Sequence, residues 1–192
     1  MTTPTITDYL KYANLQMAAE AFIRDEKTGE LARSGSLLIA ALIRGNNHSS
    51  KFTKIQAEAF AEQWEVVDQR ANTTTGFSGT LFRNKANPNE HVISLRSTEF
   101  IDDTVRDNLA CNTYEIKNTG YAWGQISDME AWYAELKKTG GPLDGKAFSV
   151  TGYSLEDHLA TGFSLLYPGA VQGTPMFEAA NAAIYKVTKG EL

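Results

Sequence analysis

The sequence has 192 residues, of which 42% are hydrophobic and 21% charged, and this composition is typical of one globular domain with a sizeable core. The net charge of −5 offers no basic surface for nucleic acid or an anionic membrane, so we expect neither as a partner. Cys111 is the single cysteine and has no partner for an internal disulfide, and no apolar run approaches the roughly 20 residues of a transmembrane helix.

The first third of the chain carries helical patterns. Apolar residues recur at helical spacing over three ranges: 5 to 25, 36 to 44 and 50 to 63. Thr5, with Asp8 three positions later, resembles a helix cap, and Gly45 is placed to end the second helix. We expect the apolar faces of these helices to lie in the core; the alternative is a helical cap that meets lipid or an acyl chain. Residues 1–63 are therefore predicted to form a helical N-terminal segment.

From residue 64 onward the pattern alternates between β-prone runs and helices. The predicted strands are 64 to 71, 77 to 84, 91 to 97 and 146 to 152. The predicted helices are about 100 to 110, 121 to 138, the segment that ends at Pro168-Gly169, and 175 to 186. Strands that alternate with helices indicate right-handed crossovers and a mainly parallel sheet with helices on both faces, which is an α/β fold. Residues 64–192 are thus predicted to be a sheet-and-helix core within one domain, 1–192, with 91–97 and 146–152 as its central strands.

Residues 146 to 168, KAFSVTGYSLEDHLATGFSLLYP, predict a buried strand, a tight turn and a helix, with Ser154 at the turn. Gly152 permits backbone dihedrals that other residues resist. A serine in a strand-to-helix turn exposes its Oγ atom, and the amide of the next residue points at the same space. A nucleophile with an oxyanion-hole donor needs this geometry. The alternative is a buried strand-turn-helix with an incidental serine.

This stretch resembles the nucleophile elbow of α/β-hydrolases, most closely that of the fungal-type (class 3) lipases and their bacterial relatives, whose pattern is G-[HY]-S-L-G-G-[HA]-L-A. HVISLRSTEFIDDTVRDNLA, residues 91 to 110, is similar to that family's strand with F-R-G-[TS] and the D-W-x-x-D-like segment that follows. NTGYAWGQISDMEAWYAEL, residues 118 to 136, resembles the H-x-G-[FY] stretch and the helix before the elbow. The similarity covers roughly residues 60 to 172, in the family's order and spacing.

The resemblance implies a partial α/β-hydrolase fold and a lipase- or carboxylesterase-like serine hydrolase that acts on lipid or acyl esters. Ser154 would be the nucleophile, and the amides of Leu155 and Thr98 would form the oxyanion hole. We expect no cofactor and no metal, since histidines, cysteine and carboxylates show no metal-ligand spacing. The resemblance suggests a secreted protein, but no N-terminal signal peptide is visible, so we expect export by another route or else a cytoplasmic location.

Two departures from the family pattern bear on activity. Glu156-Asp157 stand where the family has Gly-Gly; carboxylates in a first helical turn favour the helix but oppose the negative charge that develops in an oxyanion hole. The family's acid and base follow the serine in the order Ser, Asp/Glu, His, and no histidine follows His158 in this sequence. His158 lies one helical turn after Ser154, so it is the base candidate, although it matches a family position that is often histidine without being catalytic.

Three interpretations remain open: an incomplete hydrolase, a non-catalytic binding or structural relative that keeps the elbow as a folding element, and a truncated fragment of a longer secreted lipase. A sheet that stops soon after its nucleophile strand leaves an apolar edge, so we expect self-association or poor solubility of the isolated chain. His91 opens a predicted strand and His48 lies in a polar loop, and we expect both to be solvated rather than catalytic.

Overall fold

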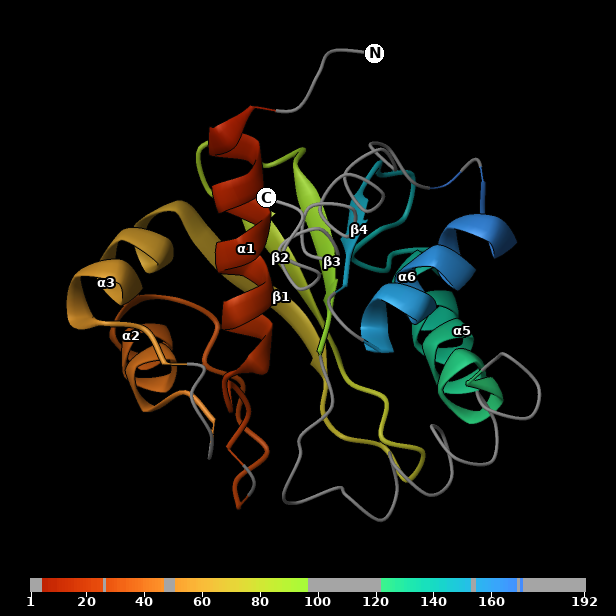
Figure 1. The fold of residues 1–192 in the computed structure, drawn as a ribbon, viewed down its shortest axis with the longest axis horizontal. Helices are drawn as coiled ribbons and strands as arrows, with labels where there is room; N and C mark the ends of the chain where they lie inside the picture. Colours follow the sequence, from red (N-terminus) through yellow and green to blue (C-terminus); the bar gives the residue numbers. More distant parts are fainter. Residues whose placement is uncertain are drawn as a thin grey trace, which may run out of the picture.

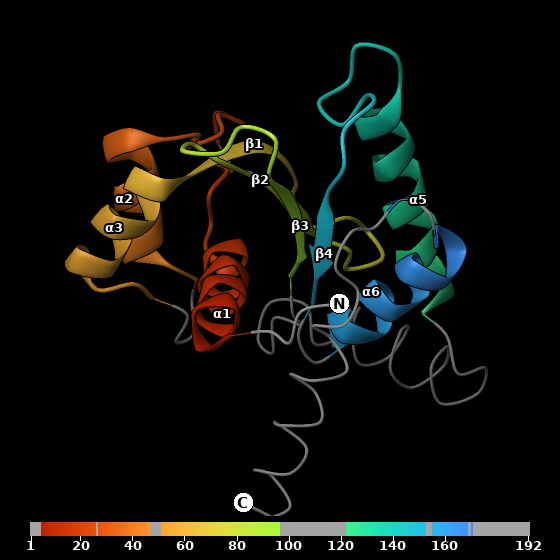
Figure 2. The same ribbon diagram turned by 90° about the horizontal axis from the view of Figure 1, so that it is seen from above.

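The computed structural model describes residues 5–25, 27–46, 51–96, 122–152, 155–168 and 170, and of residues 155–158 it describes the backbone. Its elements are α1 (Ile6–Glu20), α2 (Gly35–Arg44), α3 (Lys54–Gln63), β1 (Trp64–Arg70), β2 (Gly79–Asn84), β3 (His91–Leu95), α5 (Trp123–Lys137), β4 (Ser149–Thr151) and α6 (Leu155–Leu166). Figures 1 and 2 show a central sheet with α1, α2 and α3 on one face and α5 and α6 on the other. The prediction of helices on both faces is confirmed.

Local signals in the sequence account for most helix ends. α1 begins after Thr5 because Thr5 and Asp8 form a capping box, in which the Asp8 carboxylate accepts a hydrogen bond of 2.9 Å from the Thr5 amide. α2 ends at Gly45, whose φ of 65° lies in the left-handed region that glycine adopts without strain. The helix predicted over 5–25 is too long, since the chain becomes extended at Ala21. The predicted helix at 175–186 and the one at 100–110 lie outside the described residues.

The apolar face of α1 is only half buried. Leu15, Ala18 and Ala19 are fully buried in the core, whereas Ile6 is 87% and Leu10 60% exposed. The expectation that the whole face lies in the core is therefore correct for the second half of α1 and wrong for the first. Within the described part of the chain, no helix is long and apolar enough to cross a membrane.

The sheet is mixed, and the prediction of a mainly parallel sheet is wrong. The strand order is β1-β2-β3-β4; β1 pairs antiparallel with β2 and β2 antiparallel with β3, while β3 and β4 are parallel. Only short turns join the first three strands, and a parallel pair needs a crossover of about a dozen residues or more. The connection from β3 to β4 contains α5 and is long enough for a crossover, and β3–β4 is the one parallel pair among the four described strands.

The two edge strands of the described sheet, β1 and β4, have different surroundings. Along β1, the amide of Val66 donates to the Arg33 carbonyl at 2.8 Å, and the Arg24 guanidinium donates to the Gln69 carbonyl at 2.8 Å. These bonds cover the outer edge of β1, and covered edges resist pairing with another chain. β4 is the other edge of the described sheet, not a central strand as predicted. Self-association through this edge stays a prediction.

Two apolar cores fill the space on either side of the sheet. One lies between the sheet and α1, α2 and α3; the other lies between the sheet, α5 and α6 and contains Trp132, which is 1% exposed. The Trp132 ring lies directly on β2 at Gly79, where an added Cβ would stand 2.6 Å from the indole Cζ3 atom. Glycine is needed at this position because the ring comes too close to the backbone for any side chain.

Candidate functional site

The segment around Ser154 is a strand followed closely by a helix. β4 ends at Thr151 and α6 begins at Leu155, so residues 152–154 connect them. This order confirms the predicted strand and helix on either side of the turn, although the strand is shorter than the predicted 146–152. Ser154 itself lies outside the described residues.

The strand that leads to Thr98 ends beside the strand that leads to Ser154. β3 and β4 are parallel neighbours, and Ser94 near the end of β3 is opposite Thr151 at the end of β4. The carboxyl ends of two parallel strands meet at one edge of a sheet, which is where open α/β sheets bind ligands. Thr98 lies outside the described residues, but the chain leaves β3 at the edge where it also leaves β4.

Four aromatic rings hold α6 against β4 and α5. Phe163 of α6 contacts Tyr133 of α5 edge-on, with ring centroids 4.8 Å apart, and lies 5.9 Å from Phe148, the residue before β4. Tyr167 lies 4.7 Å from Tyr133 and donates a hydrogen bond of 3.0 Å to Glu130. Edge-to-face pairs at these distances add to the stabilisation from burial. The elements on both sides of the turn are thus packed into one core.

The two tyrosines of this cluster stay neutral. Burial raises the pKa of Tyr133 above its ordinary value of 10.0. Burial also raises the pKa of Tyr167, and the hydrogen bond to the neighbouring Glu130 carboxylate raises it further. Both side chains therefore remain protonated near neutral pH.

The start of α6 places two of the predicted site residues on one helical turn. Leu155 is the first residue of α6, and His158 follows in the same turn; the side chains of both lie outside the description. The first four amides of a helix have no intrahelical partner, so the Leu155 amide is not used by the helix itself. Glu156 and Asp157 lie in this first turn as well.

His91 is buried, which corrects the expectation that it is solvated. It is 2% exposed at the start of β3, its Nδ1 atom lies 3.3 Å from the Asn89 carbonyl, and its Nε2 atom has no partner within the described residues. Burial lowers the pKa of His91 below its ordinary value of 6.5, and the nearby positive charges of Lys146 and Arg83 lower it further. The sequence position at the start of a strand gave no signal for this burial. His48 lies outside the described residues.

This burial predicts a loss of stability in mild acid. In the unfolded chain His91 takes up a proton near pH 6.5, whereas in the folded chain it does so only at lower pH. The contribution of neutral His91 to the free energy of unfolding is therefore complete above the unfolded pKa and is lost as pH falls toward the folded pKa. We expect the urea midpoint of the unmodified chain to fall more than that of His91→Phe between about pH 7.5 and about pH 5.5. Equal falls in the two proteins would refute a role for His91.

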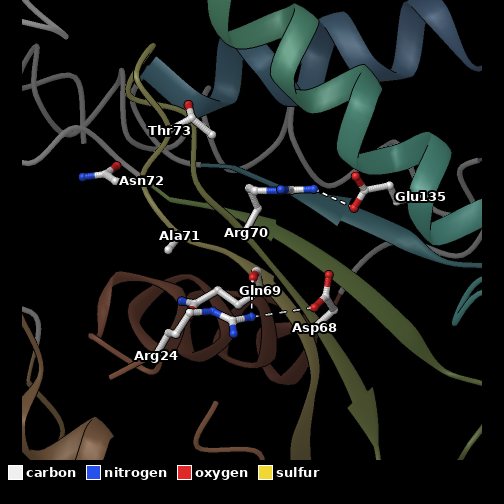
Figure 3. Close-up of a pocket in the computed structure, with 8 residues that line it drawn as sticks. All are labelled: Arg24, Asp68, Gln69, Arg70, Ala71, Asn72, Thr73 and Glu135. Atoms are coloured by element: carbon white, nitrogen blue, oxygen red, sulfur yellow. Dashed lines mark hydrogen bonds and ion pairs between the residues drawn. The ribbon is translucent and has the colours of Figure 1, made fainter. Parts of the chain in front are cut away.

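A polar pocket of about 440 Å³ lies at the end of β1 (Figure 3). It is lined by Arg24, Asp68, Gln69, Arg70, Ala71, Asn72, Thr73 and Glu135. The carboxyl end of β1 is at the same edge of the sheet as the carboxyl ends of β3 and β4, because Arg70 pairs with Gly79 and Gly79 with Leu95. The pocket is nevertheless separated from β4 by β2 and β3.

The charges in this pocket balance one another. Arg24 lies 3.9 Å from Asp68, and Arg70 forms a 2.6 Å ion pair with Glu135 from α5 (Figure 3). Two paired cations and two paired carboxylates favour neither an anionic nor a cationic ligand. Sequence reasoning singled out none of these residues, since a strand end and a helix far apart in the chain carry no shared motif. Within the described ranges, no three His, Cys, Asp or Glu side chains are grouped so as to hold a metal ion.

Comparisons with known proteins give one distant structural likeness. No family model matches the sequence, and no curated protein matches it. Among solved structures, the Lip2 lipase from Yarrowia lipolytica is similar with a TM-score of 0.39 and 16% sequence identity, over 86% of this chain and 56% of that chain. This chain thus spans little more than half the length of that lipase. The chain is similar to part of a fungal lipase, at a level too low to define its family.

Proposed function

We propose that this chain is a serine ester hydrolase of the lipase or carboxylesterase type, with Ser154 as its nucleophile and lipid or acyl esters as its substrates. The observation that supports the proposal is the strand β4, parallel to β3, followed after three residues by the helix α6. A serine in such a connection has its Oγ atom exposed above the sheet edge. The resemblance of residues 152–160 to the nucleophile elbow of class 3 lipases identifies that serine as Ser154.

In the proposed reaction, the Ser154 Oγ atom attacks the ester carbonyl carbon and loses its proton to a base. The amides of Leu155 and Thr98 hold the oxyanion of the tetrahedral intermediate. Collapse of the intermediate returns the proton from the base to the departing alcohol and leaves an acyl-serine. Water then gives a proton to the base and attacks the acyl carbonyl, and the acid leaves as Ser154 regains the proton. The Leu155 amide fits its role as the first amide of α6, which has no intrahelical acceptor.

The second candidate function is a non-catalytic hydrolase-like module. Glu156 and Asp157 directly follow Leu155 in α6, and they favour it because negative charge opposes the charge that develops in an oxyanion hole. In this alternative the connection between β4 and α6 is only a folding element. The two candidates differ in whether Ser154 reacts.

The test is Ser154-dependent reaction with esters and with a serine-directed fluorophosphonate. We expect the purified chain to hydrolyse a chromogenic short-chain ester barely above background and to label slowly, and both signals to disappear in Ser154→Ala. Ser164→Ala is the matched control, because the Ser164 hydroxyl only donates to the Ala160 carbonyl within α6 at 3.0 Å, so this variant should label like the unmodified chain. Identical labelling of the unmodified chain and Ser154→Ala would favour the non-catalytic module.

A further inference from the structure

A row of polar residues crosses the four described strands of the sheet in register. Gln69 of β1 pairs with Thr80 of β2, Thr80 with Ser94 of β3, and Ser94 with Thr151 of β4. Side chains two residues apart on a strand share a face, and Phe82 and Val92 belong to the core beneath the N-terminal helices. Thr80 and Ser94 therefore face the same side, toward α1.

This row is deeply buried and incompletely hydrogen-bonded. Thr80 and Ser94 are 0% exposed, and Gln69 is 6% exposed. At the β4 end, Gln16 of α1 donates to the Thr151 hydroxyl at 2.8 Å, a contact between residues 135 positions apart. Four oxygen atoms around the row have no partner within the described residues: Gln16 Oε1, Gln69 Oε1, Thr80 Oγ1 and Ser94 Oγ. Buried polar atoms without partners are rare because their desolvation is costly.

We infer that this row is a binding site for a file of water molecules between the sheet and α1. Side chains on adjacent strands repeat at roughly 4.8 Å. Two hydrogen bonds of about 2.8 Å that meet near the tetrahedral angle span about 4.6 Å, so one water molecule bridges hydroxyls on neighbouring strands. Water donates to amide oxygens and both donates to and accepts from hydroxyls, which matches all four unpartnered atoms.

The charges and the surroundings favour water over other ligands. The row contains hydroxyls and amides only, whereas an ion needs opposite charges to offset its desolvation. The hydroxyls of the two central strands are fully buried, which favours a ligand of the smallest size. Gln69 belongs both to the row and to the wall of the polar pocket in Figure 3, so one end of the row lies next to that pocket.

The variant Thr80→Val distinguishes a hydrated row from a dry one, because the two cases predict opposite changes in melting temperature. The change removes the hydroxyl and nearly keeps the shape of the side chain. In a hydrated row the water loses a partner, and we expect the melting temperature to fall by about 2–4 °C. In a dry row the change removes an unpartnered polar group, so an unchanged or raised melting temperature would overturn the inference. Thr151→Val is the matched control, since it removes a hydroxyl whose hydrogen bond is known.

Counting internal water gives a second, independent readout. Oxygen-17 relaxation of water reports long-lived internal molecules, and we expect at least one fewer in the Thr80→Val, Ser94→Ala double variant than in the unmodified chain. An equal count in the two proteins overturns the inference whatever the melting temperatures. If the double variant does not fold, a crystal structure of the unmodified chain decides: ordered water between Thr80 and Ser94 supports the inference, and its absence at high resolution overturns it.

Discussion

Replacing Trp132 by alanine is expected to produce the largest loss of stability of any single change in the described core. The side chain is 1% exposed, its ring centroid lies 5.9 Å from that of Phe77, and its Nε1 atom donates to Asp68 at 2.8 Å. It therefore joins α5 to both β1 and the turn before β2. Removing a buried aromatic side chain costs about 3–5 kcal/mol, because transfer free energy is lost and a cavity remains.

That cost is large against the total stability of a domain, which is typically about 5–15 kcal/mol. Gly79 lies beneath the ring and has no side chain that could fill the cavity, so the cost of the cavity remains. For a chain of this size, the loss corresponds to a fall in melting temperature of roughly 6–20 °C.

Urea unfolding followed by circular dichroism measures this loss of stability. Trp123→Ala is the matched control: Trp123 is the first residue of the same helix, and its side chain is 55% exposed. Its replacement should change the free energy of unfolding by only about 0.5 kcal/mol. Similar midpoints for the two variants would show that the contacts of Trp132 do not hold α5 on the sheet.

The helices were predictable because their signals are local. The apolar stripe of α5 contains Ile126, Met129 and Leu136 at helical spacing, and all three are buried. Periodicity defines such a face, but it does not say how far along the helix the neighbouring elements extend. The first turns of α1 illustrate this limit, since Ile6 and Leu10 continue the apolar pattern beyond the core.

The pairing of individual residues across neighbouring strands was not predictable. The burial of His91 and the polar row depend on which residue stands opposite which, and the single sequence contains no signal for register between β1, β2 and β3. The prediction of parallel strands was wrong for a related reason. Three strands precede the helix α5, and their short connections favour antiparallel pairs over the expected crossovers.

The candidate site was predictable at the level of its elements. The sequence indicated the strand before Ser154, the helix after it and the strand before Thr98, and all three elements are present. The nucleophile-elbow pattern is made of consecutive residues, so the sequence alone shows which residues to test. The polar pocket was missed because Arg24, Arg70 and Glu135 come from three separate parts of the chain.

The double change Glu156→Gly, Asp157→Gly is expected to leave ester turnover close to background, even though it restores the Gly-Gly of the lipase pattern. Both residues lie in the first turn of α6, where their carboxylates favour the positive end of the helix. Two glycines there cost up to about 1 kcal/mol each in stability. The change therefore weakens α6 slightly while it removes two negative charges from the residues that directly follow Leu155.

The two possible defects differ in size, and this difference decides the expected rate. Losing one oxyanion-hole donor typically lowers turnover by about a hundred- to a thousandfold. Losing the base of a triad lowers it by roughly a millionfold. Removing the carboxylates corrects only the smaller defect, so turnover stays slow unless a base acts on Ser154.

The measurement is turnover of a chromogenic short-chain ester by the Gly-Gly variant, with Ser154→Ala in the same background as its control and circular dichroism to verify the fold. We expect the rate to rise by less than about tenfold, well below the change that repair of a working oxyanion hole would bring. A rise of about a hundredfold or more that disappears with Ser154→Ala would contradict this prediction. It would mean that a base is already present, and His158, one turn after Ser154, would be the first residue to replace.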